Sequence, residues 1–178
     1  MKEKIVLGLS GGVDSAVAAR LLQERYDVTG LYLDIGLGGT GAADAAAVAE
    51  LYNWYVTHST ATFQYDLCTE EFQRENIAYV QQRAPFLVAV NAAGKLCGFA
   101  CAHPWHSRTA YAWDVELTVY CAHDCVGQGV GGRLYKALLD GVRQRGYCNA
   151  VALVTGQNKE SCAFHKALGF KKIGVEPR

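Results

Sequence analysis

The sequence has no excess of charge of either sign. Its 178 residues contain 17 lysines and arginines and 17 aspartates and glutamates, so the formal net charge at pH 7 is zero. A domain whose main task is to bind nucleic acid usually carries a basic excess. The charged residues are scattered, without a polybasic or acidic tail. The composition therefore argues against nucleic acid as a partner.

Long apolar runs are missing as well. A membrane-spanning helix needs roughly 20 consecutive apolar residues, and no stretch of the chain approaches that length. We therefore expect no membrane partner. Apolar residues still make up 51% of the chain, enough to bury a core. The length suits one domain, or one domain plus a fragment.

The seven cysteines form neither a disulfide framework nor a typical zinc site. Their number is odd and no signal-peptide pattern precedes them, so we expect free thiols in a reducing cytoplasm. Cys97 and Cys101, like Cys121 and Cys125, are four residues apart, whereas zinc sites usually contain a C-x2-C pair. His123 inside the second pair leaves zinc as a minor alternative. The prediction is that no metal binds.

The first forty residues predict a βαβ unit. Residues 4–9 and 28–34 read as strands, and residues 16–24 have helical spacing. A glycine-rich loop precedes this helix, and glycines and a helix N-terminus together suit a phosphate. The candidate phosphate-binding residues are Ser10, Gly11, Gly12, Asp14 and Ser15. The spacing is not that of a Walker loop, which needs a lysine beside the hydroxyl.

The string SGGVDS at residues 10–15 resembles the pyrophosphate-binding loop (PP-loop) of ATP pyrophosphatases. Residues 4–50 are similar to the start of a tRNA 2-thiouridylase, but the resemblance stops before the further βα units that would hold the adenine. An ATP-dependent enzyme of the tRNA-thiolation type is therefore an alternative function, and we expect weak ATP binding. The glycine-dense residues 36–41 mark a boundary between a PP-loop-like βαβ fragment, residues 1–41, and a second domain, residues 42–178.

Helix and strand patterns alternate in the second domain. Helices are predicted at residues 43–57, 69–83, 131–145 and 161–168, and strands at residues 86–91, 96–103, 115–121, 149–155 and 170–175. This pattern predicts an α/β (α+β) fold with a mixed central sheet flanked by helices. Residues 127–132, GQGVGG, lie between a strand and a helix, where backbone amides could surround a phosphate. Taken alone, this string also fits a plain turn.

Residues 100–135 resemble phosphinothricin acetyltransferases of the GNAT superfamily without gaps. The matching strings are residues 103–108, 110–111 and 113–120, with further family strings at residues 60–63 and 158–170. The resemblance covers residues 43–175. It implies a GNAT-like fold, acetyl-CoA as co-substrate and a small amino-acid-like amine as acceptor.

The resemblance also implies where the two substrates bind. The cofactor-binding residues would be Val119, Tyr120, Cys121, Gly127, Gln128, Gly129, Val130, Gly131, Gly132 and Asn158. Backbone groups of residues 119–121 would pair with the pantetheine arm, and the amides of residues 127–132 would hold the pyrophosphate. Phe63, Arg108 and Tyr111 would bind the acceptor. A guanidinium suits an oxyanion such as a carboxylate, although a solvated arginine is the alternative reading.

Glu116 would be the general base. An amine must be neutral to attack a thioester, yet a free amino acid is mostly ammonium at pH 7. A partly desolvated carboxylate can remove the proton. Tyr120 and His165 are candidates for protonating the leaving thiolate. The alternatives are a solvated strand residue for Glu116 and a packing histidine for His165.

The sequence departs from the family pattern at three places. Val126 stands where the superfamily loop usually opens with Arg or Gln, so one ionic contact to coenzyme A would be lost. The family's first strand is replaced, and residues 31–36 would serve in its place. We expect the family's last strand to be missing. These departures leave an inactive CoA-binding remnant as a further alternative, and a homodimer as one way to restore the sheet edge.

Overall fold

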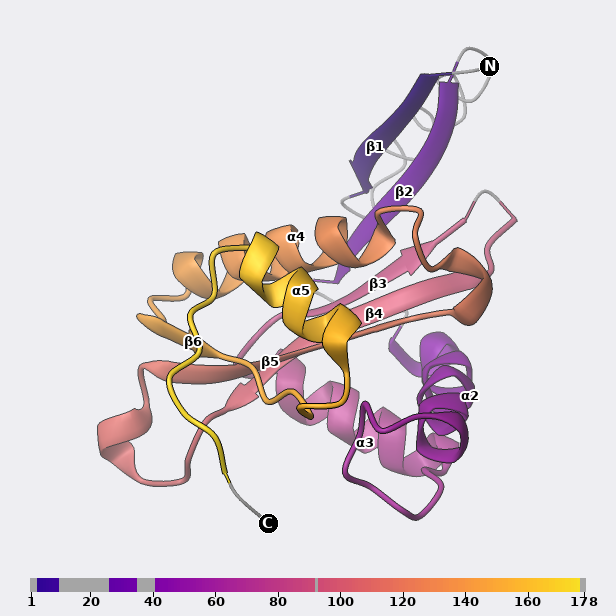
Figure 1. The fold of residues 1–178 in the computed structure, drawn as a ribbon. Coiled ribbons are helices and arrows are strands. Elements are labelled where there is room, and N and C mark those ends of the chain that lie inside the picture. Colours follow the sequence, from indigo (N-terminus) through magenta and orange to yellow (C-terminus); the bar gives the residue numbers. More distant parts are fainter. Residues whose placement is uncertain (1–2, 10–25, 35–40, 92, 177–178) are drawn as a thin grey trace.

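The computed structural model describes residues 3–9, 26–34, 41–91 and 93–176 (Figure 1). The strands are β1 Glu3–Leu9, β2 Tyr26–Asp34, β3 Phe86–Val90, β4 Leu96–Pro104, β5 Asp114–Cys121 and β6 Asn149–Val151. The α-helices are α2 Gly41–His58, α3 Glu70–Gln81, α4 Val130–Gln144 and α5 Lys159–Ala167, and the 3-10 helices are η1 Thr109–Tyr111 and η2 His123–Cys125. The predicted helix at residues 16–24 and the loop at residues 10–15 lie outside the described residues.

One mixed sheet joins the strands in the order β1-β2-β3-β4-β5-β6. β1 and β2 are parallel, β2 to β5 are antiparallel neighbours, and β5 and β6 are parallel again. Helices α2 and α3 cover one face of the sheet, and α4 and α5 lie on the other (Figure 1). The predicted fold class is therefore confirmed. No helix among the described residues is both long and apolar enough to cross a membrane.

β2 extends the sheet beyond β3. Residues 30–34 of β2 pair antiparallel with residues 86–90 of β3. Residues 31–34, the described part of the expected substitute strand, thus occupy a place in the sheet beside β3. The domain boundary at residue 41 stays a prediction.

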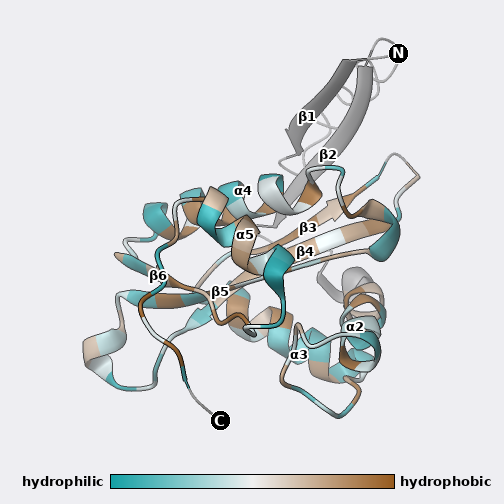
Figure 2. Cartoon of the chain, viewed as in Figure 1, coloured by the Kyte–Doolittle hydropathy of each residue, from teal (hydrophilic) through white to brown (hydrophobic). Residues whose placement is uncertain are grey.

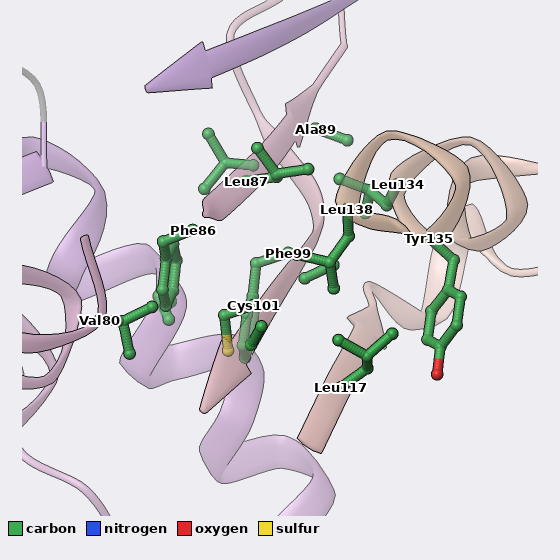
Figure 3. Packing of buried hydrophobic residues seen from close by; sticks show 14 of the residues in the cluster. Val80, Phe86, Leu87, Ala89, Phe99, Cys101, Leu117, Leu134, Tyr135 and Leu138 are labelled. Carbon is green, nitrogen blue, oxygen red and sulfur yellow. The ribbon is translucent and has the colours of Figure 1, made fainter. Parts of the chain in front are cut away.

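The core lies on both faces of β4, whose residues 96–102 are all buried. A strand covered by helices on both sides is apolar throughout rather than alternating. Figure 3 shows Phe99 stacked on Phe86 on the side of Val80, whereas Leu134 and Leu138 pack on the opposite side. The central strands are mostly hydrophobic, and α4 alternates hydrophobic with hydrophilic residues, as expected for an amphipathic helix (Figure 2).

Two predictions about the last strands need correction. β6 covers only residues 149–151, because the chain leaves β5 after Val151. The strand predicted at residues 170–175 is wrong, since the structure places no strand there. The ring of Phe170 packs against Tyr135 and His165, but Ile173 is 86% exposed. The apolar residues of the segment 170–175 thus do not form one buried strand face.

Candidate active site

Strands β5 and β6 separate halfway along β5. They pair only from Asp114 opposite Asn149 to Glu116 opposite Val151. β5 continues to Cys121 and pairs with β4 on its other side. The edge of residues 117–121 that faces away from β4 therefore has no strand partner among the described residues. An open edge of this kind can take up an extended ligand as an added strand.

A cleft of about 1130 Å³ lies at this separation. Its walls come from α2, α3, β4, β5 and α5, and from the segments that precede α4 and α5. The predicted site residues that line it are Phe63, Glu116, Val119, Tyr120, Cys121, Gly127, Gly129, Val130, Gly131, Gly132, Asn158 and His165. The structure thus brings most of the predicted cofactor and catalytic residues to one cleft.

Arg108, Tyr111 and Gln128 do not line the cleft. Arg108 precedes η1 and Tyr111 ends it, on the connection between β4 and β5. The ring of Tyr111 packs against His106, at 4.7 Å between ring centroids. No lysine or arginine among the described residues lines the cleft. The role of Arg108 and Tyr111 as an oxyanion clamp stays a prediction.

Glu116 lies on the face of β5 that points toward α2 and α3. Side chains alternate along a strand, and Val115 and Leu117 are buried on the opposite face. Glu116 is half-buried, and its burial raises the pKa of the carboxyl above the ordinary value of 4.5. A raised pKa makes the carboxylate a stronger base. The position and the electrostatics both suit proton removal.

Tyr120 lies on the same face as Glu116, where its ring belongs to an aromatic wall. Tyr52, Tyr55 and Phe99 pack around it, with centroid distances of 5.2, 4.9 and 5.5 Å. The Tyr120 hydroxyl donates to the carbonyl of Ala61 at 3.2 Å. Burial raises the pKa of this phenol, so it keeps its proton at neutral pH. The phenol therefore has a proton to donate, although the raised pKa makes it a weaker acid, and its hydroxyl also holds the loop after α2 against β5.

Residues 127–129 form a loop that leads into α4, and residues 130–132 are the first residues of that helix. Gly127 and Gly129 have φ values of 79° and 74°, a region that favours glycine, and Gly129 is the N-cap of the helix. A Cβ atom on Gly131 would lie 3.3 Å from the sulfur of Cys121. Within the described residues, the backbone amides of residues 127–132 donate to no acceptor. Free amides at a helix N-terminus attract an anion such as a phosphate.

Asn158 and His165 both have structural partners. The Asn158 side chain caps α5 by accepting from the amide of Ser161 at 3.0 Å. His165 is 9% exposed, and its Nδ1 lies 2.8 Å from the carbonyl oxygen of Ser161. Nδ1 must therefore donate, and the Tyr135 hydroxyl lies 3.0 Å from Nε2, where it donates whenever Nε2 carries no hydrogen. This arrangement favours the packing role for His165.

Two residues of the cleft were missed by the sequence reasoning. The Tyr55 hydroxyl donates to the carbonyl of Cys121 at 2.6 Å and so fixes the end of β5. His103 on β4 lines the cleft opposite Glu116. Helical spacing places Tyr55 on the same face of α2 as Tyr52, and strand alternation groups His103 with Cys101. These signals could have suggested both residues.

No group of three or more His, Cys, Asp or Glu side chains in the part of the chain that the structure describes is placed to hold a metal ion. The cysteines in this part are free, and Cys68, Cys97, Cys101 and Cys125 are buried.

Comparisons with known proteins agree with this geometry. Residues 48–170 match the acetyltransferase (GNAT) family, and residues 3–67 match the tRNA methyl transferase HUP domain. The second match supports the resemblance of the N-terminal segment to a PP-loop protein. Because the two matches overlap, they do not fix a boundary.

Similar proteins include acetyltransferases of small molecules. A phosphinothricin N-acetyltransferase from Streptomyces viridochromogenes is 38% identical over 134 residues, which are 75% of this chain and 73% of the relative. An L-methionine sulfoximine/L-methionine sulfone acetyltransferase from Pseudomonas aeruginosa is 32% identical over 141 residues, 78% of this chain and 81% of the relative.

A solved structure has the same fold. The phosphinothricin acetyltransferase of Sinorhizobium meliloti in complex with acetyl-CoA superposes with a TM-score of 0.75 at 27% identity. The match covers 82% of this chain and 76% of that one. Together with the family match over residues 48–170, these likenesses show that the chain belongs to the acetyltransferase (GNAT) family.

Proposed function

We propose that this chain transfers the acetyl group of acetyl-CoA to the amine of a small amino-acid-like molecule. The observation that carries the proposal is the separation of β5 from β6 beside the free amides of residues 127–132, with Glu116 where the strands part. The names of the similar proteins, phosphinothricin and methionine sulfoximine acetyltransferases, support this class of acceptor.

The residues of the cleft fit acetyl-CoA as co-substrate. The edge of residues 119–121 that has no strand partner would bond the amides of the pantetheine arm, as an added strand does. The amides of residues 127–132 and the positive end of α4 would hold the pyrophosphate. The exposed Val126 offers no charge there, so this contact would depend on backbone groups. Acetyl-CoA supplies the activated acyl group when bound.

Glu116 would prepare the amine. The acceptor enters mostly as ammonium, and the carboxylate removes one proton so that the nitrogen lone pair can attack the thioester carbonyl. The half-buried position of Glu116 raises its pKa and thus favours the transfer. Tyr120 and His165 are the two candidates for protonating the thiolate that leaves. Tyr120 keeps its proton but donates it to the carbonyl of Ala61, and both ring nitrogens of His165 are engaged, so either group must first release a hydrogen bond.

We place the reaction in the cytoplasm, since the cysteines of the described part are free thiols.

Weak ATP binding at residues 10–15 and a homodimer stay predictions. Thermal shift with acetyl-CoA and with ATP separates the two nucleotide sites, because a ligand that binds the folded chain raises its melting temperature. We expect a shift with acetyl-CoA and little or none with ATP.

A panel of acceptors tests the activity itself. The chain is incubated with acetyl-CoA and, in turn, L-methionine sulfoximine, phosphinothricin and common amino acids, and acetylated product is detected by mass spectrometry. The proposal expects product with at least one small amino-acid-like amine. Binding of acetyl-CoA without product from any of them would favour the inactive remnant, and binding of ATP alone would favour the thiolation-type enzyme.

A further inference from the structure

His103 on β4 and Glu116 on β5 lie opposite each other on two adjacent strands that line the cleft. They are directly opposed in the antiparallel ladder between β4 and β5, and both line the cleft. Directly opposed side chains have Cβ atoms about 4.5–5.5 Å apart. A single nitrogen that donates to two acceptors holds them about 5 Å apart, given bonds of about 2.9 Å. The two side chains therefore start from neighbouring positions on one face of the sheet, from which the ring nitrogen and the carboxylate can both reach one amine.

One ring nitrogen of His103 is engaged, and the other has no hydrogen-bond partner in the described part of the chain. Nε2 lies 3.4 Å from the sulfur of Cys101, two residues earlier on the same face of β4. Nδ1 has no hydrogen-bond partner among the described residues, and no buried side-chain nitrogen or oxygen in that part is unpaired. Nδ1 is therefore accessible from the cleft. Either the Cys101 thiol or Nε2 can donate in this contact. An amine can donate to Nδ1 in the tautomer whose Nε2 carries the hydrogen, because Nδ1 then presents its lone pair as an acceptor.

The charge around His103 favours a cation. The titratable groups near it are Cys101 on β4, Glu116 and Tyr120 on β5, and Tyr52 on α2, whereas α3 contributes amides to this part of the cleft. Burial raises the pKa of Cys101 to about 12 and raises the pKa values of Tyr52 and Tyr120, so these groups are neutral near pH 7. No lysine or arginine of the described chain lines the cleft.

We infer that His103 binds the amine of the acceptor together with Glu116 and restricts the reaction to primary amines. This inference rests on the proposed function. After Glu116 has taken one proton from the ammonium, a primary amine keeps two N–H bonds: it donates one to His103 and one to the remaining acceptor oxygen of Glu116, and its lone pair turns to the thioester. A secondary amine has one N–H bond and loses one of the two contacts. Burial lowers the pKa of His103 below its ordinary value of 6.5, which keeps the imidazole neutral at pH 7.

The test compares His103→Leu, which removes the acceptor atom, with His103→Gln, whose carbonyl oxygen still accepts. His58→Leu is the matched control, because His58 is exposed and does not line the cleft. We expect His103→Leu to raise the KM for the amine about 10-fold, the size of one lost hydrogen bond to a charged group. The Gln variant and the His58 control should stay within about threefold, with the KM for acetyl-CoA unchanged in all.

Two measurements on the unaltered protein test the inference without a variant. The KM for the amine should rise as the pH falls through the pKa of His103, below 6.5, because an imidazolium repels an ammonium. The N-methyl form of the best acceptor should be acetylated at least about 10-fold more slowly. An unchanged KM in His103→Leu, or equal use of the N-methyl amine, would overturn the inference. Absence of acetyl transfer to any amine would instead overturn the proposed function.

Discussion

The ladder between β5 and β6 ends where Glu116 lies opposite Val151. Before this pair the two strands are hydrogen-bonded neighbours, and after it the edge of β5 is open toward the cleft. β5 therefore presents two groups beside each other: the Glu116 carboxylate, which would receive a proton from the amine, and a backbone edge without a strand partner, which would bind the pantetheine arm. The proposed chemistry depends on this coincidence.

Substitution at Gly129 should block acetyl-CoA. In Gly129→Val the residue must leave its φ of 74°, which a β-branched side chain rarely adopts, and the amides of the loop shift with it. We expect the affinity for acetyl-CoA, measured by calorimetry, to fall at least about 10-fold. Gly146→Val is the matched control, because Gly146 has a φ of 85° at the other end of the same helix. It should cost about 1–3 kcal/mol of stability without changing affinity.

Removal of the Tyr135 hydroxyl should affect stability more than turnover. Tyr135→Phe leaves Nε2 of the buried His165 without its donor, and an unpaired buried group costs about 1–3 kcal/mol. Urea unfolding measures this loss. Tyr147→Phe is the control, since the Tyr147 hydroxyl donates to the backbone carbonyl of Arg83 at an exposed position and its loss should cost less. Normal stability with a large drop in kcat would instead indicate that His165 works in the reaction.

The features of this site that depend on adjacent residues could be predicted from the sequence. The contacts between segments far apart in the chain could not. Positive φ at Gly127 and Gly129 and the start of α4 follow from a few adjacent residues. The short β6 and the unpaired residues after Phe170 depend on which partner lies beside them, which periodicity does not reveal. The contact between Tyr135 and His165 joins different helices. His103 meets Glu116 only through the register of β4 and β5, which the sequence pattern does not fix on its own.

The pH dependence of kcat should have an acid limb that belongs to Glu116. Proton removal needs the carboxylate, so kcat falls as the pH falls through the pKa of Glu116 in the complex. Burial raises the pKa of Glu116 above 4.5 in the unliganded chain, so the corresponding limb of kcat/KM should have its midpoint above pH 4.5. The limb should be absent in Glu116→Gln. A limb that persists in that variant would belong to another group.

The rate of acetyl transfer in Glu116→Gln tests the central claim most directly. Glutamine keeps the size of the side chain but cannot take a proton, so kcat near pH 7 should fall about 100- to 10,000-fold, with acetyl-CoA affinity nearly unchanged. Asp114→Asn is the control, because Asp114 lies two residues earlier on the same face and outside the cleft lining; its kcat should stay close to that of the unaltered chain. A Gln variant that retains more than about half of the original turnover would show that Glu116 is not the base.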